Sequence, residues 1–307
     1  MKKVELHVHL DGSLNVDRVS SLLNKDVKND MQITSKINNL DDYLTKFDIP
    51  ISVLQTKEEL ISSAQDLLDS FRKDDVIYAE VRFSPLLHLK YLTMDEVVET
   101  LINAFKDKDI KINLLLCMMR GFNKEDNKKV VDTAYKYLNK GVCGIDLAGS
   151  ESKYSVLLYK DLFDYASKLN IPFTIHGGEA DGYKSVLDCI NLGAKRIGHG
   201  IRSIEDKDTV NLLKKNNILL EVCVRCNLQT LNIDIKDHPI KELYDEGVLI
   251  SINTDNRTVS NTNLNKEYNL LKDYFSDDDF IKFNINAIRG AFISDEEKED
   301  LLTKLLS

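Results

Sequence analysis

Two histidines near the start of the chain, His7 and His9, are separated by one residue within an apolar segment. Residues i and i+2 of a β-strand point to the same face, so a strand here would bring both imidazoles together. Asp11 follows at the same spacing and adds a carboxylate to that face. Neutral imidazoles on a rigid strand are typical zinc ligands, although such pairs also occur without a metal. The rest of the chain must therefore decide between a metal site and ordinary packing.

Further candidate ligands follow other apolar segments. Among the six histidines of the chain, His176 and His199 end short β-branched runs, and Asp255 follows another such run. Chance clustering of this kind at strand ends is improbable, which favours a metal site. His88 and His238 have no comparable placement and are predicted to be surface or capping residues.

Eight short apolar runs predict the strands that would position these side chains. They are residues 4–10, 76–83, 111–119, 142–148, 172–176, 195–199, 218–223 and 248–254. Longer amphipathic stretches lie between them and predict helices, at 57–73, 94–107, 124–139, 156–169, 206–216 and 238–246. Buried strands that alternate with helices indicate a parallel sheet, and eight such units predict an α/β fold, a (β/α)8 TIM-type barrel.

The predicted barrel also implies where the remaining segments of the chain lie. Residues 1–307 form a single domain, since no linker or repeat divides them. The connection over about residues 14–75 is too long for one helix and is predicted to carry extra helices over the carboxyl rim as a lid. Residues 256–307 are predicted to form closing helices. Active sites of such barrels lie at the carboxyl ends of the strands, where the eighth strand neighbours the first and brings Asp255 to the histidine pair.

Alternating polar residues also occur inside the predicted barrel. Glu80, Arg82 and Ser84 share one face of the second strand and are predicted to form an interior polar network, with Ser84 nearest to a substrate. Asp146 on the fourth strand is either part of such a network or a partner of a metal ligand, and the sequence leaves both open.

Composition excludes several classes of function. The chain has 307 residues and a net charge of −9, with 50 acidic and 41 basic residues, which disfavours a nucleic-acid partner. No apolar stretch approaches the about 18 residues of a membrane helix. An odd number of cysteines in predicted strands and helices is typical of reduced thiols, so a cytoplasmic location is expected. They are Cys117, Cys143, Cys189, Cys223 and Cys226.

The candidate residues suggest metal-assisted hydrolysis. A zinc ion lowers the pKa of its bound water to about 7 and so supplies hydroxide at neutral pH. His199 would act as a base for that water or orient it. Glu179, three residues after His176, would give a proton to the substrate. The alternative for Glu179 is a hydrogen-bonding partner of His176.

Six segments of the chain, in order, resemble the adenosine deaminase family of metal-dependent amidohydrolases. They are VELHVHLDGSL at 4–14, AEVRFSP at 79–85, GIDLAGSE at 144–151, HGGE at 176–179, RIGHG at 196–200 and SINTD at 251–255. The resemblance implies hydrolytic deamination of adenosine and 2′-deoxyadenosine to the inosines and ammonia, in purine salvage. It also implies one zinc ion per chain and a small-molecule purine nucleoside as the partner. It leaves the oligomeric state open, a monomer included.

The resemblance assigns a role to each site residue. It implies that zinc is held by His7, His9, His176 and Asp255. It implies that Glu179 protonates purine N1 and that His199 orients or deprotonates the zinc-bound water. Asp11 would contact a ribose hydroxyl, and the backbone of Gly149 would donate to purine N3, where a glycine permits close approach.

Two other kinds of function are weighed against this one. The same chemistry could act on adenine, AMP or an N6-substituted adenylate, but relatives with those substrates tend to carry Glu or Asn where this chain has Asp11. A non-catalytic binding protein on the same barrel predicts a lost ligand or a lost Glu179, and none is lost.

The chain departs from the family pattern at several positions. Asn256 stands where the family often has aspartate, and its amide would donate to purine N7 at any pH. His176-Gly177-Gly178-Glu179 replaces His-Ala-Gly-Glu, and residues 15–40 are shorter than usual. The usual Pro-Thr-Ser-Asn turn is Val224-Arg225-Cys226-Asn227, which leaves the pocket wall there undetermined. The resulting Cys-x-x-C pair, Cys223 and Cys226, has no second pair beside it and is predicted to be incidental packing.

Overall fold

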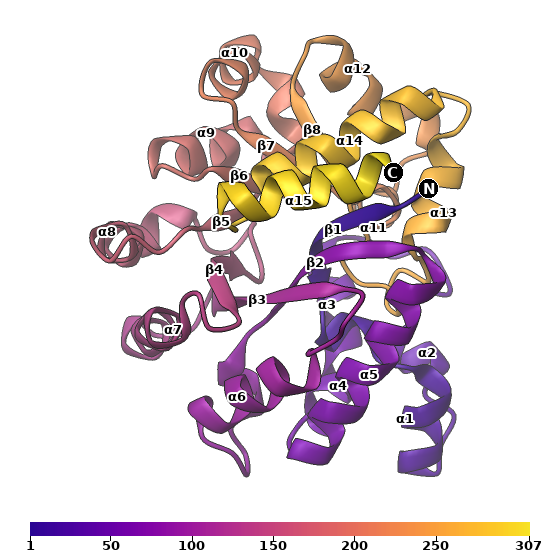
Figure 1. Cartoon of the computed structure of the whole chain (residues 1–307), viewed down its shortest axis with the longest axis vertical. Helices are drawn as coiled ribbons and strands as arrows, with labels where there is room; N and C mark the ends of the chain where they lie inside the picture. The colour runs from indigo at the N-terminus through magenta and orange to yellow at the C-terminus, as the bar shows by residue number, and fades with distance from the viewer.

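Eight parallel strands enclose a barrel in the computed structural model, which describes residues 1–307. The strands are β1 (Lys3–His9), β2 (Val76–Phe83), β3 (Lys111–Met119), β4 (Val142–Ala148), β5 (Thr174–Gly177), β6 (Arg196–His199), β7 (Leu219–Val222) and β8 (Leu249–Ile252). They pair as two four-stranded sheets, β1–β4 and β5–β8, around a common interior (Figure 1). The predicted (β/α)8 barrel and all eight strands are confirmed.

Single bridges join the two sheets and close the barrel. Ile145 of β4 bridges Phe173, and Val8 of β1 bridges Asp255 beyond β8. At the second seam the Asp255 N–H donates to the His7 carbonyl at 2.8 Å, and the His9 N–H donates to the Asp255 carbonyl at 2.7 Å. The last four strands have four residues each. β6 ends at His199, which is left-handed (φ 62°), and left-handed Asp255 (φ 58°) turns the chain beyond β8.

The helices lie outside the strands (Figure 1). Those between successive strands are α5 (Lys57–Lys73), α6 (Met94–Ala104), α7 (Lys124–Tyr137), α8 (Lys160–Lys168), α9 (Tyr183–Asn191), α10 (Lys207–Lys215), α11 (Val224–Thr230) and α12 (Ile240–Asp245). α6 begins with a capping box, in which Thr93 and Glu96 satisfy each other's backbone N–H. The sequence did not predict α11, whose seven residues lack a side-chain cap at Cys223 and include β-branched Val224 and Thr230.

The first connection is built from short helices. They are the 3-10 turn η1 (Asp11–Ser13), α1 (Val16–Leu23), α2 (Lys28–Met31), α3 (Leu40–Leu44), the 3-10 turn η2 (Thr45–Phe47) and α4 (Asp48–Val53). The Tyr43 hydroxyl hydrogen-bonds the Ser260 hydroxyl at 2.6 Å, and the Ile33 N–H donates to the Val259 carbonyl. These contacts join the connection to the loop after β8, at the carboxyl end of the barrel.

The carboxyl-terminal helices cover the opposite end. They are α13 (Leu264–Leu271), α14 (Asp277–Gly290) and α15 (Asp295–Leu306). Val4 and Leu6 at the start of β1 pack in an apolar cluster with Ala287 and Ile288 of α14 and Leu301 of α15. The amino ends of the strands are therefore sealed by apolar packing, and the carboxyl ends remain for a site.

The barrel interior contains a polar network that includes Glu80 and Arg82 as predicted, but not Ser84, whose hydroxyl has no hydrogen-bond partner. Arg82 donates to Asp146 Oδ2 at 2.8 Å and to Glu221 Oε2 at 2.7 Å. Arg196 donates to Glu221 Oε1 at 2.7 Å and pairs with Glu80. All five side chains are fully buried. Pairing both guanidinium groups with carboxylates is what allows these charges to be buried.

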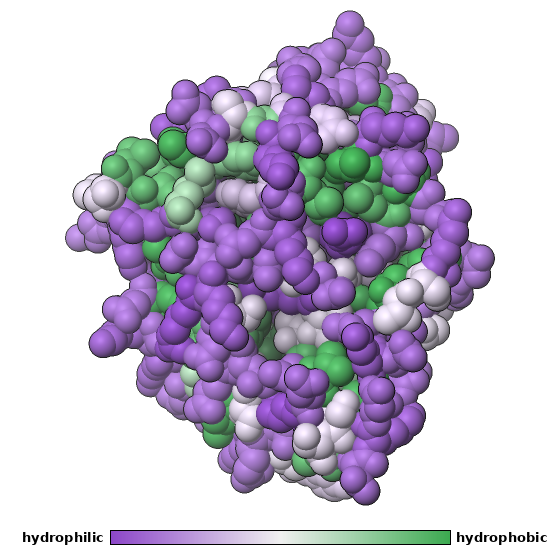
Figure 2. All heavy atoms as spheres, turned by 90° about the vertical axis from the view of Figure 1, so that its right-hand side faces the viewer, coloured by the Kyte–Doolittle hydropathy of each residue, from purple (hydrophilic) through white to green (hydrophobic).

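Hydrophilic residues dominate the face drawn in Figure 2, and apolar residues gather there in separate patches. No helix combines the length and the apolar character needed to span a bilayer.

Candidate active site

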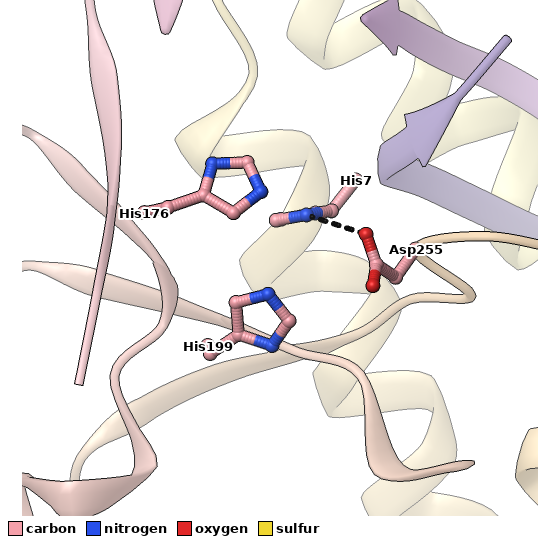
Figure 3. A group of neighbouring side chains, drawn as sticks. All are labelled: His7, His176, His199 and Asp255. Carbon is pink, nitrogen blue, oxygen red and sulfur yellow. Dashed lines mark ion pairs between the residues drawn. The ribbon is translucent and has the colours of Figure 1, made fainter. Parts of the chain in front are cut away.

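Three histidines and one aspartate converge at the carboxyl ends of the strands. His7 and His9 come from β1, His176 from β5, and Asp255 directly follows β8. His7 Nε2 and His9 Nε2 each lie 3.3 Å from Asp255 Oδ1, and His9 Nε2 lies 3.2 Å from His176 Nε2. In Figure 3 the side chains of His7, His176 and Asp255 point toward one another, with His199 beside them.

A carboxylate lies beside Nδ1, the ring nitrogen away from the common centre, in both His7 and His176. His7 Nδ1 lies 2.9 Å from Glu221 Oε2, and His176 Nδ1 lies 2.9 Å from Asp146 Oδ2. At His7 the Glu221 carboxylate accepts the Nδ1 proton and leaves the Nε2 lone pair directed at the common centre. The contact of His176 with Asp146 has the distance of an ion pair but not the geometry of a hydrogen bond. Asp146 thus joins the Arg82 network and also lies against His176, so it has both of the contacts that the sequence left open.

The donor set fits a metal ion. His7 Nε2 is buried and has no hydrogen-bond partner. Burial lowers the pKa of His7 and of His9 well below the usual value, and the Arg82 charge lowers both further. Neutral imidazoles with one carboxylate are typical of a catalytic zinc site that keeps an open position.

His199 also lies close to this centre. His7, His176, His199 and Asp255 each have a donor atom within 4.8 Å of the others, so either His9 or His199 could complete the set. The ring of His199 has other contacts, however: its Nδ1 lies 3.0 Å from Asn227 Nδ2 and its Nε2 lies 3.5 Å from Glu179 Oε2. These contacts favour His9 over His199 as the fourth candidate donor.

Glu179 lies in the turn after β5 and faces the centre. Its Oε1 is 3.5 Å from Cys226 Sγ, and its Oε2 is the atom near His199. Burial, and then the charges of Asp255 and Glu151, raise the pKa of Glu179 well above its usual value. This shift favours the protonated form that a proton donor needs. Asp146 occupies the position beside His176 that the alternative interpretation gave to Glu179.

The Glu151 carboxylate fixes the turn that carries Glu179. It accepts hydrogen bonds from four successive backbone N–H groups, those of residues 178–181, at 2.5, 3.0, 2.7 and 3.1 Å. It also accepts from the Ser185 hydroxyl. Glu151 was not singled out from the sequence, because its partners follow it by about 30 residues and no local pattern connects them.

A cavity of about 190 Å³ opens beside the convergent side chains. The three predicted substrate contacts, Asp11, Gly149 and Asn256, all line it. Its outer wall comes from the first connection and consists of Leu40, Tyr43, Leu44, Phe47 and Ile51. The sequence predicted a lid in this region but did not identify the residues that would face the pocket.

Asp11 reaches the cavity by a route that the sequence did not predict. β1 ends at His9, and Leu10 has helical dihedral angles (φ −62°, ψ −51°), so Asp11 belongs to a 3-10 turn and not to the strand. Its Oδ1 is buried and has no hydrogen-bond partner, and burial raises the pKa of Asp11 to about 7. The side chain is thus available to a polar ligand.

Two glycines are required by their surroundings. A Cβ on Gly12 would lie 1.8 Å from Asn256 Oδ1, so only glycine allows the turn and this loop to meet. Gly149 has a φ of 101°, which side chains rarely adopt, and it leaves the backbone open toward the cavity.

Two further predictions need correction. His88 and His238 are buried, with 0% and 5% exposure, and are not surface residues, although His238 Nδ1 accepts the first N–H of α12, as a capping residue does. Cys223 and Cys226 pack in a small apolar cluster, as expected of incidental packing, but the Cys226 thiol also contacts Glu179. The signal for Cys226 was its place in the segment that departs from the family pattern.

Comparisons with known proteins identify the family and the fold of the chain. The sequence model of the adenosine deaminase family matches residues 2–307. An adenosine deaminase from Clostridium kluyveri is 38% identical, over 99% of this chain and 93% of its own. An adenine deaminase from Arthrobacter aurescens superposes with a TM-score of 0.86 at 22% identity, over 99% of this chain and 98% of its own. An amidohydrolase from Burkholderia ambifaria, solved with bound Zn, gives 0.89 at 19% identity, over 100% and 90%. At these identities the solved structures support the barrel fold alone.

Proposed function

The chain belongs to the adenosine deaminase family, and we propose that His7, His9, His176 and Asp255 hold the zinc ion with which it deaminates adenosine. The enzyme hydrolyses adenosine to inosine and ammonia. The observation that carries the zinc proposal is the convergence of three Nε2 atoms and one carboxylate oxygen beside a cavity. When bound, zinc lowers the pKa of its water to about 7, so that hydroxide is available for attack at neutral pH.

Glu179 is the proposed acid of the reaction. The oxygen of the attacking water forms a bond to purine C6, and the electrons displaced from the ring would leave a negative charge on N1. A protonated Glu179 gives its proton to N1 and prevents that charge. The attacking water loses two protons in the course of the reaction. One passes to the exocyclic amine, so that the bond from C6 to that nitrogen breaks and ammonia leaves, and the other restores protonated Glu179. The raised pKa of Glu179 and the fixed turn beneath it support this role.

His199 is the proposed partner of the attacking water. Its Nε2 is buried without a hydrogen-bond partner and lies on the Glu179 side of the centre. From there it orients that water or takes a proton from it.

The substrate contacts are proposed from the lining of the cavity. Asp11 would accept a hydrogen bond from a ribose hydroxyl, the Gly149 N–H would donate to purine N3, and the Asn256 amide would donate to N7. No Lys or Arg lines the cavity, which supports a nucleoside over a nucleotide such as AMP or an N6-substituted adenylate. We extend the proposal to 2′-deoxyadenosine. We also propose a cytoplasmic location, since all five cysteines are buried free thiols.

Ultraviolet-monitored turnover tests the reaction, the metal and the substrate together. The purified protein is assayed with adenosine as isolated, after chelation, and after zinc is restored, with adenine, AMP and N6-methyl-AMP in parallel. We expect turnover of adenosine that chelation abolishes and zinc restores. Turnover that survives complete removal of metal would contradict the zinc proposal, and preference for another purine would contradict the proposed substrate contacts.

A further inference from the structure

We propose that Asn227 and His238 are positioning residues that determine which ring nitrogen of His199 carries the proton. The proposal rests on the proposed function, because it decides between the two roles that function leaves open for His199. Neither residue lines the substrate cavity, so each acts only through His199.

Three hydrogen bonds connect these residues in a line. His199 Nδ1 lies 3.0 Å from Asn227 Nδ2, and Asn227 Oδ1 lies 3.4 Å from His238 Nε2. The backbone N–H of Ile240 donates to His238 Nδ1 at 3.2 Å. The side chains come from the end of β6, from α11 and from the residue before Pro239, and all are buried.

The Ile240 N–H determines which atoms donate and which accept along this chain of hydrogen bonds. A backbone N–H can only donate, so His238 Nδ1 must accept, and the single proton of the neutral ring lies on Nε2. Burial lowers the pKa of His238 to about 4, which keeps the ring neutral at physiological pH. His238 Nε2–H therefore donates to Asn227 Oδ1.

The orientation of the Asn227 amide follows from this. With Oδ1 turned toward His238, the amide N–H₂ is turned toward His199 Nδ1, which must accept. The opposite orientation would place the N–H₂ against the Nε2–H of His238, and two buried donors would face each other. Through the Asn227 amide, the donor at Ile240 thus determines that His199 Nδ1 is an acceptor.

Neutral His199 consequently carries its proton on Nε2, the nitrogen that faces the site. In that form Nε2 donates a hydrogen bond to the attacking oxygen and cannot accept a proton from it. His199 therefore orients the attacking water, and the protons that this water loses pass to the exocyclic amine and to Glu179 without being held by His199.

Nitrogen NMR of the ¹⁵N-histidine-labelled, zinc-loaded protein shows directly which ring nitrogen of His199 carries the proton. Protonated and unprotonated imidazole nitrogens have well separated chemical shifts, and the chain has only six histidines to assign. We expect His199 to show an unprotonated Nδ1 and a protonated Nε2. A proton on Nδ1, or on both nitrogens, at neutral pH would overturn the proposal, and this measurement needs no variant.

Variants test the transmission. His238→Phe keeps the ring volume and removes both nitrogens, whereas His238→Gln retains an N–H donor toward Asn227. We expect His238→Phe to lower kcat about tenfold with little change in KM, to mix the two His199 tautomers, and to be rescued by Gln. Asn227→Asp replaces the donor with an acceptor and should move the proton to Nδ1. Asn284→Asp, another buried asparagine at the far end of the barrel, is the matched control and should change neither tautomer nor kcat.

The outcomes separate this proposal from the proposed function. Unchanged kcat and unchanged His199 shifts in both Asn227→Asp and His238→Phe would refute the relay, even if the enzyme deaminates adenosine. A wild-type protein that shows the expected tautomer but does not act on adenosine would instead contradict the proposed function.

Discussion

At the scale of single residues, burial sets the protonation states on which the chemistry depends. It lowers the pKa of His7 and raises the pKa of Glu179, which favours a neutral imidazole and a protonated carboxyl group. Burial disfavours the charged form of each group. The charged form of histidine is the protonated one and that of glutamate is the deprotonated one, so the two pKa values move in opposite directions. One buried pocket thus provides both the proposed metal ligands and the proposed proton donor.

Replacing Glu179 by glutamine should remove the proton donor while keeping the shape of the side chain. We expect Glu179→Gln to lower kcat by about 10²- to 10⁴-fold, the usual contribution of acid catalysis, with zinc content unchanged. Adenosine turnover and metal analysis measure the two effects. Glu242→Gln, an exposed change on α12, is the control. A Glu179→Gln variant that turns over at the parent rate would refute the proposed mechanism.

Removing the Asp11 carboxylate should affect recognition of the sugar. We expect Asp11→Ala to lower kcat/KM for adenosine about 10- to 100-fold, the value of one hydrogen bond to a charged group. The comparison substrate is 9-methyladenine, which has the same base and no ribose hydroxyl, and its kcat/KM should hardly change. An equal loss on both substrates would mean that Asp11 does not contact the sugar.

At the scale of elements, the turns after the strands determine the geometry of the site. The turn after β5 directs four N–H groups at one carboxylate, Glu151, and thereby holds Glu179 in place. A carboxylate suits this position because it only accepts hydrogen bonds and carries the charge that the N–H groups favour.

Glu151→Gln should disturb this turn without changing its packing volume. The amide places an N–H₂ group against backbone N–H groups, so we expect a loss of about 2 kcal/mol in unfolding free energy and a lower kcat. Urea unfolding and adenosine turnover measure these effects. Asp181→Asn changes an exposed carboxylate on the same turn and should leave both nearly unchanged. Equal effects of the two variants would argue against a special role for Glu151.

At the scale of the whole molecule, stability depends on ionisable groups buried in neutral form. His88 is fully buried, and burial lowers its pKa from 6.5 to about 4. The unfolded chain therefore binds a proton between these values where the folded protein does not. Stability conferred by neutral His88 is fully present above about pH 6.5 and is lost as the pH falls toward 4.

His88→Phe should make the protein less sensitive to acid. At pH 5 the proton uptake by unfolded His88 costs about 2 kcal/mol. We therefore expect the difference in unfolding free energy between pH 7 and pH 5 to shrink by about that amount, whatever the variant does to packing. His88→Gln should show the same reduction, and an undiminished pH dependence in both would show that His88 is not neutral in the fold. Denaturant unfolding at the two pH values makes the measurement.

The sequence by itself determined the features that depend on neighbours in the chain. Alternation and β-branched runs identified all eight strands, because the period of a strand is local. His7 and His9 were predicted to act together because two residues apart on a strand means the same face. The order of strands in a closed barrel was enough to predict that Asp255 meets them.

Only the tertiary structure decided the contacts that join distant segments. Glu221 orients His7 across 214 residues, and His238 reaches His199 through a helix that the sequence did not predict. Asp11 was expected on the strand, but the chain turns at Leu10 to bring Gly12 against Asn256. Such contacts follow from the packing of whole elements, whose angles and separations leave no periodic signal in the sequence. The spacing of the candidate ligands His7 and His9 is therefore a local property of the sequence. The hydrogen bonds that orient the rings of His7 and His199 form only when the barrel has closed.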